Sequence, residues 1–317
     1  MKKFIKHILF FFVIVIAIDF IIGQTGDYLV SHVKYGDAKR TNDLLMVDKH
    51  DVIIMGSSRA RHHYDTPFLS DTLGLDVYNA GFDGNGVILA YGLLELMLER
   101  YQPKLIVFDV EPAFDIIEYK DDNNHKRYIT RLKPYYKNEA VGDIIKSVSL
   151  EEWYKVHSGM LRYNMNLLTM FAEEATERGD YIKGFYPLQG DYKRSLEQSK
   201  TQAKTEHVVL KNDLFKLDYM EKLVKLAKAK EIPLLIVASP KYGKVDSKDL
   251  QPVVDICKKY NIPFVDYYAN EECMNHTEWF KEPMHLNATG ARYFSRLVSS
   301  DIRNLIDEYN RKSELSY

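Results

Sequence analysis

The sequence that decides the fold is Asp51-Val52-Ile53-Ile54-Met55-Gly56-Ser57-Ser58. It begins with a short apolar run that is rich in β-branched residues and stops at a glycine. Such a run is typical of a strand that is buried on both faces, as in a parallel sheet. We therefore predict a core strand here, with the two serines at the turn that leads into the next helix.

Similar apolar runs recur along the chain and alternate with segments of helical spacing. The runs lie at residues 75–80, 105–110, 234–238 and 263–267. Helical spacing is found at residues 87–101, 214–230, 245–260 and 294–306. This alternation predicts an α/β fold, a three-layer sandwich around a parallel, flavodoxin-like sheet of about five strands. The residues expected to be buried in that sheet are Met55, Val77, Val107, Val237 and Val265.

Residues 112–212 interrupt the alternation. Within them, 143–157 and 160–177 have the spacing of helices, and a glycine-containing passage follows at 184–190. We expect a helical insertion in an α/β domain that spans residues 51–310. Because the insertion follows the third strand, it should lie over the carboxyl edge of the sheet, where open α/β folds place their sites.

The N-terminus has the pattern of a signal anchor. Basic residues in Met1–His7 precede an apolar stretch, Ile8–Ile22, whose only charged residue is Asp19. No Ala-x-Ala cleavage pattern follows, and no cysteine is available for lipidation. We predict a transmembrane anchor at residues 1–30 and a polar stalk at 31–50; the alternative is a buried N-terminal helix. Basic residues before the helix favour a cytoplasmic N-terminus, with the domain on the periplasmic or extracellular side of the cytoplasmic membrane.

Composition excludes some classes of protein. The 317 residues are 46% hydrophobic and 28% charged, which suits a large globular core rather than a disordered chain. The net charge of −2 creates no strong field for polyanions, so nucleic acid is not an expected partner. Cys257 and Cys273 are the only cysteines and form one disulfide or none.

Two short segments carry candidate catalytic residues. Ser58 stands at the strand-to-helix turn, where free N–H groups of a helix N-terminus can stabilise an oxyanion. His285 stands on a loop before the last helix, three residues after Glu282, whose carboxylate can orient the imidazole. Each segment alone has a structural reading as well, because serine is a preferred N-cap and an isolated histidine is more often structural.

Together these segments resemble the SGNH/GDSL hydrolases. Gly56-Ser57-Ser58 stands at the first block of that family, Glu282-Pro283-Met284-His285 at the last, and Tyr78-Asn79-Ala80-Gly81 after the second strand. The resemblance implies Ser58 as nucleophile, His285 as base and Glu282 as the orienting carboxylate. It also implies that the N–H groups of Ser58 and Gly81 bind the oxyanion.

The chain departs from the family at two points. The third block of the family contains an oxyanion-binding Asn, whereas this chain reads Phe108-Asp109-Val110-Glu111-Pro112; Asn85 is the candidate substitute. The second departure is Glu282 in place of Asp. The missing Asn weakens the catalytic reading more, because losing one oxyanion donor can cost roughly 10²–10³ in rate.

The resemblance and the anchor together predict a serine esterase or O-acyltransferase. The expected substrate is an acyl ester, acetyl in the first place, of a cell-envelope glycan, by analogy with anchored members of the family. The alternative is a catalytically inactive glycan-binding or scaffold protein that assists a membrane acyltransferase. No cofactor is expected. The stretch Gly81–Gly86 imitates a dinucleotide loop, but it follows the second strand rather than the first.

The remaining candidates are weaker. Arg59 and Arg61 flank the nucleophile and suit an anionic substrate or a solvated helix face. His62-His63 lacks the spacing of a metal pair, so no metal site is predicted. Aromatic residues of the insertion suit a platform for sugar rings or core packing. They include Trp153, Tyr154, Tyr163, Tyr181 and Tyr186.

Overall fold

The computed structural model describes the chain except for residues 120–124, 165, 178–180, 193–208, 244–246 and 315–317. Parts of the predicted insertion and of the predicted helix 245–260 therefore lie outside the described residues. The chain forms two compact units. The N-terminal unit comprises Met1–Val47 and His125–Gly179, and the sheet unit comprises Asp48–Asn124 and Asp180–Tyr317.

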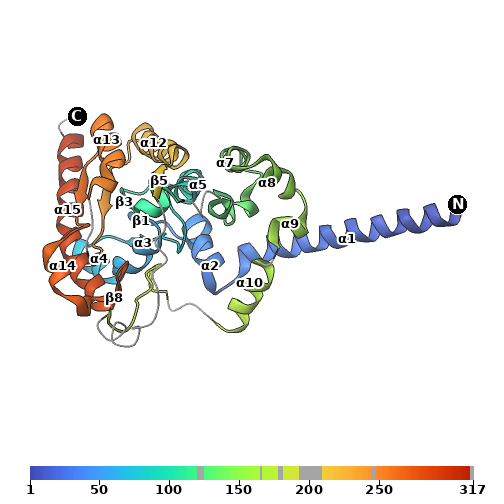
Figure 1. The fold of residues 1–317 in the computed structure, drawn as a ribbon, viewed down its shortest axis with the longest axis horizontal. Helices are drawn as coiled ribbons and strands as arrows, with labels where there is room; N and C mark the ends of the chain where they lie inside the picture. The colour runs from blue at the N-terminus through green and yellow to red at the C-terminus, as the bar shows by residue number, and fades with distance from the viewer. Residues whose placement is uncertain (120–124, 165, 178–180, 193–208, 244–246, 315–317) are drawn as a thin grey trace. The chain divides into compact units, whose positions relative to one another are not determined.

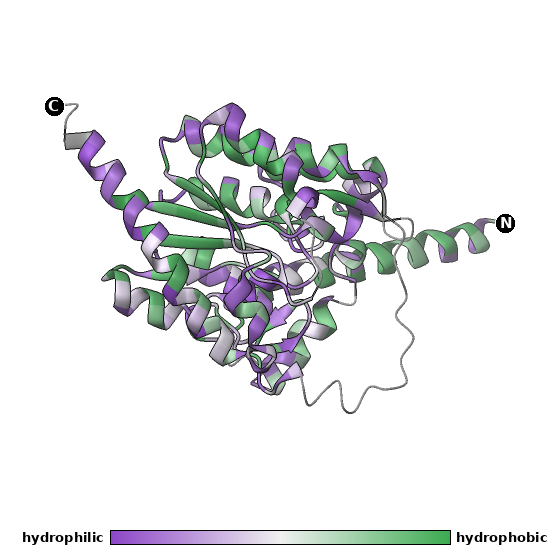
Figure 2. Cartoon of the chain, turned by 60° about the vertical axis from the view of Figure 1, so that its left-hand side comes forward, coloured by the Kyte–Doolittle hydropathy of each residue, from purple (hydrophilic) through white to green (hydrophobic). Residues whose placement is uncertain are grey.

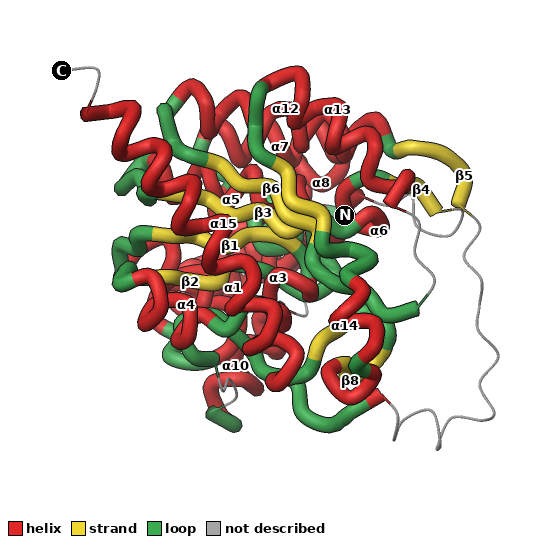
Figure 3. The backbone as a smooth tube through the Cα atoms, turned by 90° about the vertical axis from the view of Figure 1, so that its left-hand side faces the viewer, coloured by secondary structure: helices red, strands yellow, loops and turns green. Residues whose placement is uncertain are grey.

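The sheet unit is built on five parallel strands in the order β2-β1-β3-β6-β7 (Figures 1 and 3). The strands are β1 (Val52–Gly56), β2 (Val77–Asn79), β3 (Leu105–Asp109), β6 (Leu234–Ala238) and β7 (Phe264–Asp266). Counting only these strands, the order is 2-1-3-4-5, which is the flavodoxin-like order. All five apolar runs form strands of one sheet, and the predicted fold class is confirmed.

Helices cover both faces of the sheet. One group is α3 (Ser58–His63), α4 (Thr66–Leu73) and α15 (Ala288–Glu314), and the other is α5 (Val87–Leu98), α12 (Leu214–Ala229) and α13 (Gln251–Tyr260). Val52 and Ile54 pack in one core cluster with Phe294 of α15. Ile53 and Met55 point to the opposite face, because side chains alternate along a strand, and they are also fully buried. Burial of both faces explains why the run has no polar alternation.

One of the expected core residues is less buried than predicted. Met55, Val77, Val107 and Val237 have no exposed surface, whereas Val265 is only partly buried. Val265 lies on β7, which is an edge strand and has a neighbouring strand on one side only. Position in the sheet, which the apolar run itself does not reveal, accounts for the difference.

The other elements of the sheet unit are short. They are α6 (Pro112–Asp115), β4 (Ile117–Tyr119), β5 (Val209–Asn212), a 3-10 turn (Ser247–Leu250), α14 (Glu271–Asn275), a second 3-10 turn (Thr277–Trp279), β8 (Phe280–Glu282) and β9 (His285–Leu286). β4 pairs with β5 and β8 with β9, both antiparallel. The β4–β5 pair joins the two ends of the insertion.

The N-terminal unit is helical. Its elements are α1 (Lys2–His32), α2 (Gly36–Asn42), a π-helix (Asp43–Val47), 3-10 turns at His125–Ile129 and Lys133–Tyr135, α7 (Glu139–Val148), α8 (Leu150–Lys155), α9 (Gly159–Tyr163) and α10 (Asn166–Ala175). The two helices predicted in the insertion are each broken in two. Ser149 ends α7 and its side chain caps α8, while Asn164 adopts a positive φ of 43° after α9. Serine and asparagine favour such caps and turns because their short polar side chains satisfy nearby backbone groups.

Helix α1 is long and apolar enough to cross a membrane, with a mean hydropathy of 2.6 over its most apolar window (Figure 2). Its lone charge in the apolar stretch has a partner, since Asp19 accepts hydrogen bonds from Ser158 Oγ (2.6 Å) and the Met160 N–H (2.9 Å) at the start of α9. Two turns later, Asp27 accepts from Tyr163 Oη at 2.5 Å. The helices of the insertion are therefore attached to the second half of α1 within this unit.

Both cysteines are free thiols. Cys257 lies on α13 and Cys273 on α14, and both are buried. Burial raises the pKa of each thiol to about 12. The alternative left open by the sequence, one disulfide or none, is decided in favour of none in this structure, and neither thiol is activated as a nucleophile.

Candidate active site

The two serines after β1 differ in their hydrogen bonds. Gly56 ends the strand with a φ of +141°, and a Cβ there would lie 2.5 Å from the Asp109 carbonyl oxygen, so only glycine fits the turn. Ser57 is the N-cap of α3, because its side chain accepts a hydrogen bond from the Arg59 N–H. Ser58 is the first residue of α3 and keeps its hydroxyl for other contacts. The cap reading and the nucleophile reading thus apply to neighbouring residues.

A tight hairpin holds the candidate base. Strands β8 and β9 pair so that Glu282 stands opposite His285, with Pro283 and Met284 at the turn. His285 Nδ1 makes a short hydrogen bond with the Glu282 carboxylate, which also accepts from the Met284 N–H at 3.0 Å. Burial alone would raise the pKa of Glu282, but these hydrogen bonds lower it below its ordinary value. An ionised Glu282 fixes the proton on Nδ1 and leaves Nε2 as the acceptor.

The structure brings Ser58, His285 and Glu282 together. His285 Nε2 lies 2.7 Å from Ser58 Oγ, although the two residues are 227 positions apart in the chain. This distance is within the roughly 2.6–3.2 Å that proton transfer requires. The His285 side chain is 24% exposed, so a substrate can approach it. The three side chains are arranged as nucleophile, base and orienting carboxylate are in serine hydrolases, and these roles stay predictions.

Gly81 lies against the nucleophile turn. A Cβ on this residue would be 2.6 Å from the Arg61 nitrogen and 2.9 Å from the Ser57 carbonyl oxygen, so the close approach requires glycine. In this structure its N–H donates to Asn79 Oδ1 at 2.9 Å. The Asn85 side chain is buried, and its Nδ2 donates to the Asp83 carbonyl at 2.8 Å. Oxyanion roles for Ser58, Gly81 and Asn85 stay predictions.

A buried ion pair lies next to Ser58, the candidate nucleophile. Arg59, which is 1% exposed, donates from Nη1 to Glu111 at 2.7 Å and lies 4.0 Å from Asp109. Burial lowers the pKa of Arg59, but the two carboxylates outweigh burial and raise it. Burial raises the pKa of Asp109 to about 6, against the lowering effect of Arg59 and of hydrogen bonds from Ser239. Asp109 and Glu111, which stand where the resemblance predicts a third block, thus bind the arginine next to Ser58.

His63 connects this ion pair to the hairpin. Its Nε2 accepts a hydrogen bond from the Leu286 N–H at 3.0 Å, and burial together with Arg59 lowers its pKa well below the ordinary range. The neutral ring therefore carries its proton on Nδ1 and donates to Ser239 Oγ at 2.9 Å. Ser239 donates in turn to Asp109 at 2.7 Å. The chain of bonds ties the strand that carries His285 to the ends of β3 and β6.

Sequence reasoning missed Arg59 and His63 as parts of the site. Arg59 was expected to contact an anionic substrate or lie on a solvated helix face, and it does neither because it is buried. The signal that points to it is the pair of acids, Asp109 and Glu111, at the end of an otherwise apolar strand. Buried carboxylates need a cation or strong donors, and Arg59 is the charged residue beside the nucleophile at the adjoining strand end.

In the glycine-rich loop Gly81–Gly86, the place where a dinucleotide phosphate would bind is taken by a side chain of the protein. The Val87 N–H at the start of α5, where a pyrophosphate would bind, donates to Asp115 Oδ1 at 2.7 Å. A second Asp115 oxygen accepts from the Glu111 N–H at 2.7 Å. Burial raises the pKa of Asp115 to about 8, while these two hydrogen bonds act to lower it. In the described part of the chain, no three His, Cys, Asp or Glu side chains are grouped as metal ligands.

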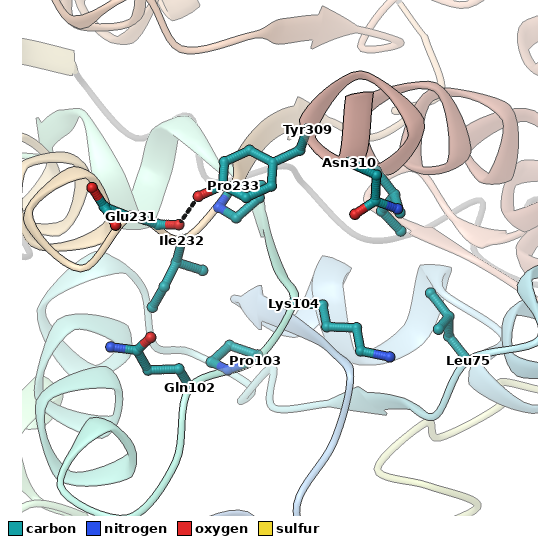
Figure 4. Close-up of a pocket in the computed structure, with 10 residues that line it drawn as sticks. Leu75, Gln102, Pro103, Lys104, Glu231, Ile232, Pro233, Tyr309 and Asn310 are labelled. Atoms are coloured by element: carbon teal, nitrogen blue, oxygen red, sulfur yellow. Dashed lines mark hydrogen bonds between the residues drawn. The ribbon is translucent and has the colours of Figure 1, made fainter. Parts of the chain in front are cut away.

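A pocket of about 300 Å³ lies at the other edge of the sheet (Figure 4). Leu75, Lys104 and Pro233, which line it, come just before β2, β3 and β6, so the pocket is at the amino ends of the strands. Tyr309 of α15 contributes to its wall and donates a hydrogen bond to the Glu231 carbonyl. The pocket contains none of the catalytic candidates, which all lie at the carboxyl edge.

Comparison with known proteins adds the following. No protein-family model matches the sequence, and the search of curated proteins gives no match. Among solved structures, the chain is similar to a protein described as lipolytic, of the G-D-S-L family, from Desulfitobacterium hafniense DCB-2, with 11% identity over 79% of this chain and 98% of that chain and a TM-score of 0.39. It is also similar to a gut microbial diltiazem-metabolizing enzyme, with 9% identity over 80% of this chain and 47% of that one and a TM-score of 0.38.

The strand order of the structure, and not these similarities, is the evidence for the predicted fold. The flavodoxin-like strand order places the Ser58 turn directly after β1 and the His285 hairpin directly before α15. The chain therefore has a flavodoxin-like α/β fold, with the Ser58 and His285 segments where the resemblance to the SGNH/GDSL hydrolases predicts them.

Proposed function

We propose that the protein is a serine esterase or O-acyltransferase that acts on the acetyl ester of a cell-envelope glycan. The observation that carries the proposal is the 2.7 Å contact between Ser58 Oγ and His285 Nε2, with Glu282 on the other ring nitrogen. Proton transfer needs this geometry before any other property of the site.

The reaction follows from the protonation states. His285 Nε2 takes the Ser58 proton, and Ser58 Oγ attacks the ester carbonyl. The negative charge that develops on the carbonyl oxygen is held by N–H groups at the Ser58 turn, with Gly81 and Asn85 as the proposed further donors. The tetrahedral intermediate collapses with cleavage of the bond to the sugar oxygen, and His285 gives its proton to that oxygen, which leaves as a hydroxyl. Water then hydrolyses acetyl-Ser58, or another hydroxyl accepts the acetyl group.

A catalytically inactive glycan-binding or scaffold protein is the second candidate. It is favoured by the Gly81 N–H, which donates to Asn79 instead of pointing free, and by the acids that stand where the family has its oxyanion Asn. In that case the protein would assist a membrane acyltransferase by holding the glycan.

The two candidates differ in one measurement. We expect the full chain in detergent to release acetate from nitrophenyl acetate and from an acetylated glycan, and to form acetyl-Ser58 that is detectable as a mass increase of the peptide containing Ser58. Adding a free sugar as acceptor tests transfer against hydrolysis, because transfer gives an acetylated acceptor in place of acetate. Absence of both acetate and acetyl-enzyme would favour the scaffold.

We also propose that α1 spans the cytoplasmic membrane and holds the domain on the periplasmic or extracellular side. Large apolar side chains of its first two turns and beyond are exposed, among them Phe4, Phe10, Phe11, Phe12, Ile16 and Phe20. An 18-residue apolar stretch is about 27 Å long in a helix, close to the hydrocarbon thickness. We expect the full chain to stay in the membrane fraction after an alkaline carbonate wash. Recovery of a mature chain that begins after about Gly23 would contradict the anchor.

A further inference from the structure

The segment 181–190, within the insertion, lies along the carboxyl edge of the sheet. The Lys183 carbonyl accepts from the Asn79 N–H at 2.9 Å, where β2 ends. The Leu188 carbonyl accepts from the Ala288 N–H at 2.8 Å, at the start of α15. The segment therefore connects the second strand with the residues that follow the His285 hairpin, and we refer to it as the edge segment.

The edge segment is also bonded to the helix that begins with Ser58. The Tyr186 N–H donates to the Arg61 carbonyl at 3.2 Å, and His62 Nδ1 donates to the Tyr186 carbonyl at 2.7 Å. The His62 ring stands edge-to-face against the His285 ring, with centroids 5.4 Å apart, and against the Tyr186 ring at 5.6 Å. One imidazole thus separates Tyr186 from the catalytic base.

Four side chains form a mixed aromatic and charged cluster at this place. The Arg61 guanidinium lies 5.0 Å from the Tyr181 ring centroid and 5.4 Å from that of Tyr186. It donates to Tyr181 Oη at 2.8 Å and to Asp83 at 2.9 Å. The Asp83 side chain is 51% exposed, so its carboxylate can accept hydrogen bonds from a ligand. Tyr186 is exposed as well.

The chemistry of this cluster suits a sugar ring. Aromatic rings offer apolar contact area and a partly negative face, which attracts the C–H groups of a pyranose. The exposed Asp83 carboxylate offers acceptors for neighbouring hydroxyls, and the Arg61 guanidinium, whose side chain is 8% exposed, holds this carboxylate and Tyr181 in place. Because the charges of Arg61 and Asp83 compensate each other, the cluster favours a neutral sugar over a polyanion.

We propose that Arg61, Asp83, Tyr181 and Tyr186 form the subsite for the neutral pyranose ring that carries the ester. This inference rests on the proposed function and names the part of the site that selects the glycan. The cluster binds the sugar, while Ser58 and His285 act on its acyl group.

The test compares two esters with the full chain in detergent. Ethyl acetate contains no ring, and methyl glucopyranoside carrying one O-acetyl group contains the proposed ligand. We expect Tyr186→Ala to lower kcat/KM for the sugar ester about tenfold more than kcat/KM for ethyl acetate, and to do so through KM, which corresponds to one lost ring contact. Tyr186→Phe keeps the ring and should behave as the wild type. Tyr154→Ala removes an exposed tyrosine of α8 and is the matched control.

A binding measurement separates this inference from the proposed function. Calorimetric titration of the Ser58→Ala chain with the same acetylated glucoside should give a Kd that Tyr186→Ala weakens about tenfold. If the wild type hydrolyses neither ester, the proposed function fails, and the titration still decides on the subsite. Equal loss on both esters, or a Kd that Tyr186→Ala leaves unchanged, would overturn the subsite.

Discussion

Replacing Ser58 or His285 with alanine is expected to lower kcat/KM for ester hydrolysis roughly 10³-fold or more, because the members of such a triad act as a unit. In the proposed reaction Ser58 Oγ bonds the acyl group, and His285 Nε2, 2.7 Å away, accepts its proton. Initial rates with nitrophenyl acetate, together with thermal unfolding of each variant, measure the effect. Folding should be preserved in both variants, since both side chains are partly exposed.

Two further variants serve as controls. Ser57→Ala should lose only the cap of α3, at a cost of roughly 1 kcal/mol in the free energy of unfolding, and keep most of the activity. Glu282→Gln should lose less activity than His285→Ala, because an amide oxygen or solvent can still orient the imidazole. Wild-type turnover by the Ser58→Ala variant, or loss of turnover in the Ser57→Ala variant, would show that Ser58 is not the nucleophile.

Arg59→Met is expected to lower the free energy of unfolding by roughly 3–5 kcal/mol, because removal of one partner leaves a buried charge uncompensated. Arg59 is 1% exposed and bonds Glu111 at 2.7 Å, with Asp109 4.0 Å away. The methionine fills most of the volume, so the loss measures the charge rather than a cavity. Denaturant unfolding of the full chain in detergent is the measurement.

Two controls for Arg59→Met separate the loss of a buried charge from the loss of packing. Arg303→Met changes an exposed arginine of α15 and should alter stability by less than about 0.5 kcal/mol. The double variant Arg59→Met with Glu111→Gln should recover part of the loss, because one of the orphaned carboxylates is removed. Equal destabilisation by the single and double variants would show that Arg59 acts through packing instead.

The position of Arg59 gives the nucleophile turn a rigid base. Arg59 follows Ser58 directly and is bonded to Ser239 at the end of β6 as well as to Glu111 after β3. His63, on the same helix, accepts from the Leu286 N–H beside the base. We infer that Arg59 and His63, both buried, help to fix the distance between Ser58 and His285.

The sequence by itself determined the fold class, because each of its five strands is an apolar run that ends at a turn. It also singled out Ser58, Glu282 and His285, since each lies in a short local pattern. Residues 282 and 285 are three positions apart, so a tight hairpin suffices to join them. The positions of Arg59 and His63 in the core were not readable in this way, because their partners lie 52 and 176 residues away.

Only the tertiary structure decided which residues surround the base. Tyr181 and Tyr186 were two of many aromatic residues in an insertion that follows no strand–helix rhythm, and periodicity says nothing about where such a segment returns. Backbone hydrogen bonds with Asn79 and Arg61 bring the edge segment back to the sheet and place Tyr186 beside His62. The position of β7 at the edge of the sheet likewise left Val265 only partly buried. Local patterns reveal local structure, whereas the neighbours of a site depend on which distant segments reach the same sheet edge.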